Sequence, residues 1–294
     1  MKDYCIRVSA GNGSIRGFGA TTTNLVNEAC KRHKTYPTAS AALGRVLTAT
    51  LMMGAMLKGD DLVTVRLLGD GPLGAVVASA NAKGQVRGYV QEPHTQTKSK
   101  YPGKLDVGSA VGKNGMLHVT KDLGLKEPYT GSVPLVSGEI AEDLAYYYQV
   151  SEQTPSAVAL GVLIDIDYKV LASGGFIIQL LPNAKEEIAV QLENNINNLP
   201  PISEMIREGE TPETILGRIL NNFAMTIHEK IPVEFSCPCS KSRLESVLIS
   251  LGKEELEAMI AEQGKAELVC HFCAEKYNFN KDELERLLRE AASK

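Results

Sequence analysis

The residues best suited to chemistry are four cysteines, arranged as two close pairs near the end of the chain. The pairs read CPC at 237–239 and CHFC at 270–273, and residues 240–269 separate them. Four thiolates can close a tetrahedral zinc site with Zn–S bonds of about 2.3 Å, which places the sulfurs about 3.8 Å apart. A Cys-x-x-Cys turn supplies that separation, and Cys-x-Cys also can, because residues i and i+2 of a strand project to the same side. The spacing therefore predicts a site for one zinc ion, formed by Cys237, Cys239, Cys270 and Cys273.

The spacing leaves two uses of this site open. One is a permanent structural zinc site, which the spacing alone favours, and the other is a redox switch. In an extended strand, the Cα atoms of Cys237 and Cys239 would lie about 6.6 Å apart, near the upper limit for a disulfide. A disulfide there would need the chain to bend, so its formation would be coupled to local disorder. Cys270 and Cys273 have the easier geometry, and we expect them to oxidise first.

The segment between the cysteine pairs must bring them together. It has two helical patterns, at 241–250 and 253–263, which we expect to pack as a small hairpin. A module of this size has little apolar core of its own, so a bound zinc ion would supply much of its stability. Residues 237–294 are therefore expected to form a small zinc-binding domain, for which a structural and a redox-switch use both stay open.

The first 183 residues are predicted to form one α+β core domain, a mixed sheet with helices packed on it. Helices are expected near 23–34, 38–57 and 140–149. Short strands separated by Gly, Asp and Asn are expected at 62–68, 75–79, 86–91, 116–121 and 131–136, and two long buried strands at 157–166 and 168–181.

Residues 184–236 differ in character and are predicted to form a helical, metastable linker. Helical patterns occur near 185–198, 201–208 and 212–228, punctuated by prolines. The segment carries nine acidic and four basic side chains and is only moderately apolar. Such a segment is expected to fold by leaning on a neighbour and to detach easily.

Composition excludes several classes of protein. The 294 residues carry 31 Lys and Arg against 35 Asp and Glu, a formal net charge of −4, which argues against a nucleic-acid partner. The N-terminus lacks an apolar run of signal-peptide length, so no export is expected. The apolar stretch 39–57 approaches membrane-spanning length, but Arg45 lies inside it and predicts a buried core helix instead. Cys5 and Cys30 lack a partner pattern and are expected to be either buried apolar thiols or harmless surface ones.

Other motifs do not support enzymatic chemistry. Residues 69–74 match G-x-G-x-x-G, but a strand rather than a helix follows, so the motif predicts a hairpin turn and not a dinucleotide site. There is no Walker A pattern and no convincing pair of nucleophile and base. His271 lies between two thiolates and is a possible alternative ligand, although a histidine there is more simply an exposed group. We therefore expect no enzyme and no catalytic residues.

The chain resembles the redox-regulated bacterial chaperones of the heat shock protein 33 family. The most specific likeness lies in FSCPCS (235–240) and CHFC (270–273), followed by Tyr277 and Phe279. PTASAALGR (37–45) and GGFIIQLLP (174–182) are also similar to that family. So is the order of core domain, helical linker and zinc module, and the resemblance extends over essentially the whole chain.

The resemblance implies a cytoplasmic, ATP-independent holdase that is inactive while reduced. Its four thiolates, here Cys237, Cys239, Cys270 and Cys273, would hold one zinc ion. Oxidants with mild unfolding stress would convert them to two disulfides, Cys237–Cys239 and Cys270–Cys273, and zinc would leave. The module and the linker would then unfold, homodimers would form, and exposed apolar surface would bind unfolding client proteins. The resemblance implies no membrane and no nucleic-acid partner.

Two other classes compete with a holdase. A zinc ribbon could bind RNA or a protein partner constitutively, although the acidic C-terminal half argues against RNA. A thiol oxidoreductase could use Cys270 and Cys273, but that activity predicts a thioredoxin-like βαβ setting, which the surrounding sequence lacks.

Overall fold

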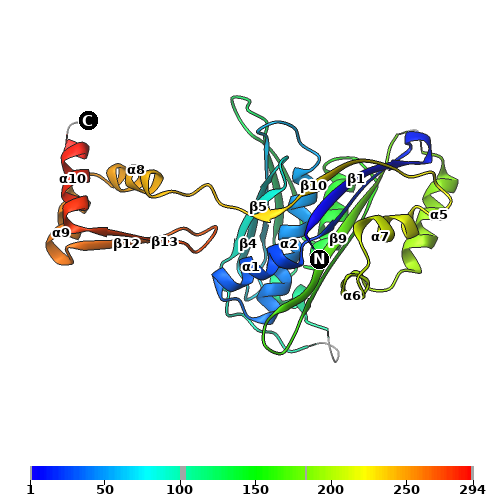
Figure 1. Cartoon of the computed structure of the whole chain (residues 1–294), viewed down its shortest axis with the longest axis horizontal. Helices are drawn as coiled ribbons and strands as arrows, with labels where there is room; N and C mark the ends of the chain where they lie inside the picture. Colours follow the sequence, from blue (N-terminus) through cyan, green and yellow to red (C-terminus); the bar gives the residue numbers. More distant parts are fainter. Residues whose placement is uncertain (1, 100–103, 183, 293–294) are drawn as a thin grey trace. The chain divides into compact units, whose positions relative to one another are not determined.

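The computed structural model describes residues 2–99, 104–182 and 184–292, and the chain divides into two compact units. The first unit is Met1–Ser236 and the second is Cys237–Lys294. Both combine helices with antiparallel sheet, so the predicted α+β class is confirmed (Figure 1). Three of the predicted domain ends, residues 1, 183 and 294, lie outside the described part of the chain.

Two sheets build the first unit. The five-stranded sheet has the order β10-β1-β2-β9-β8, and the six-stranded sheet has the order β11-β5-β4-β3-β6-β7. All neighbouring strands are antiparallel except β11 and β5, which are parallel. The strands are β1 (Tyr4–Ala10), β2 (Ile15–Thr21), β3 (Leu62–Leu68), β4 (Ala75–Asn81), β5 (Gln85–Val90), β6 (Met116–Asp122), β7 (Tyr129–Pro134), β8 (Ser156–Ile164), β9 (Val170–Leu180), β10 (Thr226–Pro232) and β11 (Glu234–Phe235).

Helix α2 (Pro37–Gly54) forms the centre of this unit, because it contacts strands of both sheets (Figure 1). Nearly all of its side chains are buried, as expected for a helix that is apolar on every face. Arg45 is its one charged residue, and its guanidinium pairs with Glu139 at 2.6 Å. The predicted core helix is confirmed, and no helix in the described residues is long and apolar enough to cross a membrane.

Three further helices complete this part of the unit. Helix α1 (Thr23–His33) packs beside α2, and α4 (Ile140–Val150) contacts both β8 and α2. The short α3 (Val107–Val111) was not expected from the sequence. The predicted turn at 69–74 is confirmed, because Leu68 of β3 pairs directly with Ala75 of β4 across it.

A second layer of helices covers the other face of the five-stranded sheet. It consists of α5 (Glu186–Asn197), α6 (Ile202–Arg207) and α7 (Pro212–Ile219) (Figure 1). Strand β9 shows how the sheet serves both layers, because Ile177 packs on the α2 side while Phe176 and Ile178 pack on the α5–α7 side. The alternation follows from the period of two in a strand, and it makes this sheet apolar on both faces.

The prediction that residues 212–228 form a helix is wrong beyond Ile219. Asn222 adopts a left-handed conformation with φ of 72°, and residues 226–232 form the edge strand β10, antiparallel to β1. The sequence TIHEKIP contains three β-branched residues, Thr226, Ile227 and Ile231, so it suits an edge strand once β1 offers a partner. Strands β1 and β2 were also not expected from the sequence.

Two glycines in the five-stranded sheet allow α6 and α7 to pack closely against it. A Cβ added at Gly161 of β8 would lie 2.6 Å from the backbone nitrogen of Ser203 in α6. A Cβ at Gly19 of β2 would lie 3.1 Å from the side chain of Leu216 in α7. Glycine at these two positions lets the helices settle directly on the strands.

Polar contacts fasten the N-terminal end of α7. The hydroxyl of Tyr4 donates to Glu213 at 2.5 Å, and the Lys230 ammonium donates to the same carboxylate at 3.1 Å. Lys230 also lies 3.8 Å from the centre of the Tyr4 ring. Burial raises the pKa of Glu213, but hydrogen bonds led by that from Tyr4 outweigh it and hold the pKa below its ordinary value. This contact joins β1, β10 and α7.

Replacing the glycine under α6 should loosen the helix layer. In Gly161→Ala the new methyl would meet the backbone of Ser203, so α6 must move, at a cost of about 1–2 kcal/mol. Proteolysis of the reduced protein within residues 186–219 should then be roughly 5- to 30-fold faster. The matched control is Gly217→Ala in α7, where a Cβ meets nothing within 4 Å. Alanine there should stabilise the helix by about 0.5–1 kcal/mol and slow cleavage. Equal cleavage rates in the two variants would contradict this packing.

Candidate metal centre

The four cysteines of the two close pairs come together in the second unit. Their sulfur atoms all lie within 4.8 Å of one another. The sulfurs of Cys237 and Cys270 are 3.8 Å apart, and those of Cys239 and Cys273 are 3.3 Å apart. These separations approach the sulfur–sulfur distance of about 3.8 Å that a tetrahedral ion with Zn–S bonds near 2.3 Å requires. The cluster can therefore hold one metal ion.

A tight turn presents the CHFC pair. It connects β12 (Lys265–Val269) to the antiparallel β13 (Lys276–Asn280). The carbonyl of Cys270 accepts from the amide of Cys273 at 3.3 Å and from that of Ala274 at 2.7 Å. Ala274 is left-handed, with φ of 56°, and the Cys270 amide donates to the Glu275 carbonyl at 2.9 Å. The expected Cys-x-x-Cys turn is thus present, and the flanking hairpin, which was not expected, closes it.

The CPC pair lies on chain without helix or strand structure, immediately before α8 (Lys241–Leu251). Cys237 and Cys239 both reach the CHFC sulfurs, so residues two apart project to the same side as expected. The Ser240 hydroxyl accepts from the amide of Arg243 at 3.3 Å and caps the helix. The cap sets where the helix starts and leaves the cysteines outside it.

A small apolar core supports the cysteine cluster. The predicted helical hairpin is present as α8 and α9 (Lys253–Glu262), and α10 (Lys281–Ala292) packs against both. The buried residues of this core, within the described part of the chain, are Leu248, Leu256, Phe279, Leu284 and Leu287. So small a core stabilises the unit only weakly, and a bound ion would contribute on the order of 10 kcal/mol.

The electrostatics of the cluster favour a bound cation. Burial raises the pKa of the Cys270 thiol, and the neighbouring Cys237 adds to the rise. Burial also raises the pKa of Cys273 well above its ordinary value. Thiols alone would therefore stay protonated at neutral pH, whereas a divalent cation reverses this preference and deprotonates its ligands.

The donor set indicates which kind of ion fits. Four soft sulfur ligands suit zinc or a similar tetrahedral ion, and they do not suit Mg²⁺ or Ca²⁺, which require oxygen. Among the described residues, the only group of three or more side chains placed to hold a metal is this set of four cysteines, and His271 is not part of it.

One contact of the cluster was missed by reasoning from spacing. The hydroxyl of Tyr277, on β13, lies 3.2 Å from the sulfur of Cys239. Hydrogen bonding to Cys239, together with burial, raises the pKa of the Tyr277 phenol. The alternation of tyrosine and phenylalanine at 277 and 279 was the available signal for a strand, but it does not reveal the partner of the hydroxyl.

The remaining cysteines lie apart from this chemistry. Cys5 and Cys30 are buried in the apolar core around α2, in the first unit, which confirms that both are buried apolar thiols. Burial raises the pKa of Cys5 to about 12, so its thiol is unreactive at neutral pH. The CHFC pair also lies in a β-hairpin turn and not in a βαβ unit, which argues against a thioredoxin-like oxidoreductase.

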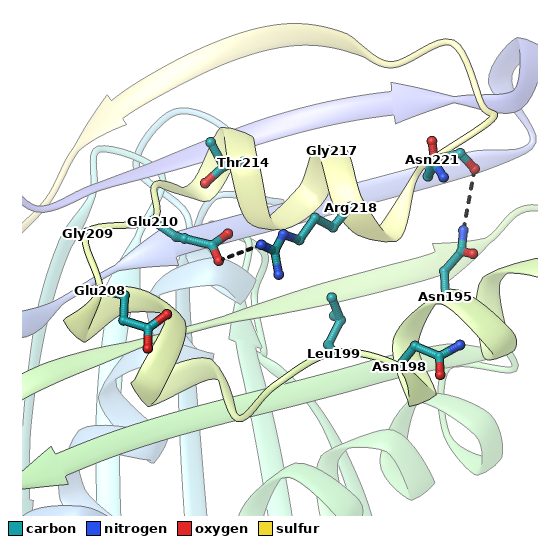
Figure 2. Close-up of a pocket in the computed structure, with 10 residues that line it drawn as sticks. All are labelled: Asn195, Asn198, Leu199, Glu208, Gly209, Glu210, Thr214, Gly217, Arg218 and Asn221. Carbon is teal, nitrogen blue, oxygen red and sulfur yellow. Dashed lines mark hydrogen bonds and ion pairs between the residues drawn. The ribbon is translucent and has the colours of Figure 1, made fainter.

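A groove among α5, α6 and α7 is the other candidate site (Figure 2). Its polar groups contact one another. Arg218 pairs with Glu210 at 3.2 Å, and the Asn195 amide donates to the carbonyls of Ile219 at 2.9 Å and Asn221 at 3.4 Å. The polar contacts in the groove therefore hold the helices of this layer together, and the residues that line it do not form a catalytic arrangement.

Loss of one thiolate should weaken metal binding. In Cys270→Ser, the Zn²⁺ affinity measured by competition with a chromophoric chelator should fall by roughly 100-fold or more, about 2.7 kcal/mol. Cys30→Ser is the control, because Cys30 lies in the other unit, and its Zn²⁺ affinity should equal that of the parent. Unchanged affinity in Cys270→Ser would rule out a four-thiolate site.

Removing the ion should unfold the second unit selectively. After treatment with a strong chelator, amides of 237–294 should lose protection from hydrogen exchange, because five buried side chains cannot hold the unit alone. Amides in strands β1–β9 should keep their protection. If the second unit stays protected after the metal is removed, its stability does not depend on the ion.

Comparisons with known proteins identify the relatives of this chain. The family model described as Hsp33 protein matches residues 3–280. The 33 kDa chaperonin of Desulforamulus reducens is 57% identical over 294 residues, covering 100% of both chains. That of Bacillus subtilis is 53% identical over 285 residues, covering 97% of this chain and 98% of the relative.

A solved structure extends the agreement to the fold. The crystal structure of the 33 kDa chaperonin from Thermotoga maritima superposes with a TM-score of 0.93 at 38% identity, covering 99% of each chain. The names of these relatives denote chaperones and not enzymes. The resemblance expected from the cysteine pairs is confirmed, and the chain belongs to the Hsp33 family of chaperones.

Proposed function

We propose that this chaperone is activated by oxidation and holds unfolding proteins without using ATP. The observation that carries the proposal is the clustering of four thiols, within 4.8 Å, in a unit whose own apolar core is small. A unit that depends on its metal loses its fold when its ligands are oxidised. The same cluster can therefore react with the oxidant and, while reduced, keep the second unit folded and the chaperone inactive.

In the resting protein, zinc is held by Cys237, Cys239, Cys270 and Cys273. Bound zinc keeps the four sulfurs ionised and therefore open to oxidants. Cysteines stay reduced, without disulfides, in a reducing compartment, which supports a cytoplasmic location. The helices α5–α7 stay docked on the five-stranded sheet through the packing described above.

Oxidation by peroxide forms the disulfides Cys270–Cys273 and Cys237–Cys239. For each, two thiolates, one hydrogen peroxide and two protons give one disulfide and two waters. The folded cluster also places Cys237 near Cys270 and Cys239 near Cys273, so sulfur distances alone do not select the pairing. Once the unit loosens, loop closure favours partners that are close in sequence. The ion is released because its ligands have been consumed.

Release of the ion then exposes apolar surface. Residues 184–236 act as the metastable linker between the core domain, 1–183, and the zinc module, 237–294. Within this linker α5–α7 are the part most ready to detach, whereas β10 is paired with β1. When these helices detach, they uncover a sheet face that carries the side chains of Ile6, Val8, Ile15, Phe176 and Ile178. Such a face suits unfolding client proteins and a second activated copy of the chain.

The charge of the protein supports a protein partner over a nucleic acid. The net charge is −4, and the linker carries more acidic than basic side chains. A nucleic-acid binder needs a strongly basic patch to neutralise phosphates. We therefore propose that the partners are unfolding proteins and that neither nucleic acid nor a membrane is involved.

The proposal is tested by oxidising the zinc-loaded protein with peroxide under mild heat. Zinc release and free thiols are followed with time, and light scattering of an unfolding test protein is followed in parallel. One zinc ion should leave as four thiols are lost, and aggregation should be suppressed only after oxidation. Reduced protein is the control, and dithiothreitol with added Zn²⁺ should reverse the effect.

Two outcomes would contradict different parts of the proposal. If the oxidised protein loses zinc but does not suppress aggregation, the holdase function is wrong. If zinc stays bound and the thiols stay reduced under peroxide, the switch is wrong.

A further inference from the structure

The hydroxyl of Tyr277 is fixed beside one particular ligand of the cysteine cluster. Tyr277 pairs with Leu268 in the β12–β13 ladder, directly after the CHFC turn, and its ring packs against the buried core of the second unit. Its oxygen lies 3.2 Å from the sulfur of Cys239, which belongs to the other cysteine pair. The register of the hairpin therefore aims this hydroxyl at Cys239.

The chemistry of the pair sets the direction of the hydrogen bond. A thiolate that binds a metal has no proton and can only accept, whereas a phenol ordinarily keeps its proton up to a pH of about 10. The Tyr277 O–H therefore donates to the Cys239 sulfur when the site is loaded. Hydrogen bonds to ligand sulfurs are a known means by which proteins tune metal–thiolate sites.

We propose that Tyr277 is a positioning residue that slows the oxidation of Cys239 by hydrogen-bonding its thiolate. This inference rests on the proposed redox function and names a residue that sets the threshold of its CPC half. In the step concerned, the Cys239 thiolate attacks hydrogen peroxide, giving a sulfenic acid and hydroxide. The Cys237 thiolate then displaces hydroxide to form the disulfide, and two protons convert both hydroxides to water.

The hydrogen bond opposes the first of these steps. The attacking electron pair is the one that carries the negative charge on sulfur, and the Tyr277 proton stabilises that charge. The bond must weaken as the charge moves to the peroxide oxygen, so the barrier is higher than without it. The CPC pair would thereby stay reduced under oxidant levels that already consume more reactive thiolates.

The test compares the zinc-loaded full chain with Tyr277→Phe under limiting peroxide. Differential alkylation and mass spectrometry follow each cysteine with time. Phenylalanine keeps the ring and removes only the donor, so Cys239 should be oxidised about 3- to 10-fold faster, with little change at Cys270 and Cys273. The control is Tyr129→Phe, which removes a hydroxyl from a tyrosine that is 53% exposed on β7 of the first unit. Its rates should match those of the parent.

A spectroscopic measurement separates tuning from structural damage. With Co²⁺ as the probe, the sulfur-to-cobalt charge-transfer band of Tyr277→Phe should shift to longer wavelength, because the Cys239 thiolate becomes a stronger donor. If the substitution prevents folding, 3-fluorotyrosine at position 277 is the second variant. It keeps the shape and strengthens the donor, so Cys239 should react more slowly.

The outcomes distinguish this inference from the proposed function. An unchanged Cys239 rate and an unchanged cobalt band in Tyr277→Phe would overturn the role of Tyr277 and leave the switch intact. Equal acceleration at all four cysteines, with faster zinc loss to a chelator, would also overturn it, because that pattern reports a loosened unit. If the parent protein keeps its zinc under peroxide, the switch fails, while the cobalt band still tests the hydrogen bond.

Discussion

The second unit of this chaperone is organised around four sulfur atoms held within 4.8 Å of one another. Burial raises the pKa values of Cys270 and Cys273, so these two thiols stay protonated at neutral pH without a cation. A bound divalent ion would supply that charge and would tie the CPC segment to the hairpin turn. Because the apolar core of the described part of the unit has only five buried members, metal–sulfur bonds would contribute most of its stability.

A second constraint operates in the first unit, where one sheet is apolar on both faces. Helix α2 covers one face and α5–α7 cover the other. The outer layer consists of short helices that depend on close contacts such as that of Ser203 with Gly161. The fold thus keeps an apolar sheet face under a layer of short helices, which is consistent with the chaperone activity of the family.

Much of this architecture could be predicted from local patterns. The spacing of the cysteine pairs identified the sulfur cluster, because metal ligation needs only that turns and strands present sulfurs at set intervals. The uniformly apolar stretch around Arg45 identified α2. The G-x-G-x-x-G stretch at 69–74 was correctly assigned to a hairpin, because a strand follows it. Each of these signals depends on residues close together in the chain.

The sequence by itself therefore determined the α+β class, the four cysteines of the cluster and the family. The tertiary structure alone decided features that join distant residues. Strand β10 forms where a helix was expected, because β1, more than 200 residues earlier, offers a pairing edge. Glu213 is held by Tyr4, and Tyr277 of β13 meets Cys239 of the CPC segment. Pairing partners and hydrogen-bond partners of this kind are set by the folded geometry, and local propensity carries no information about them.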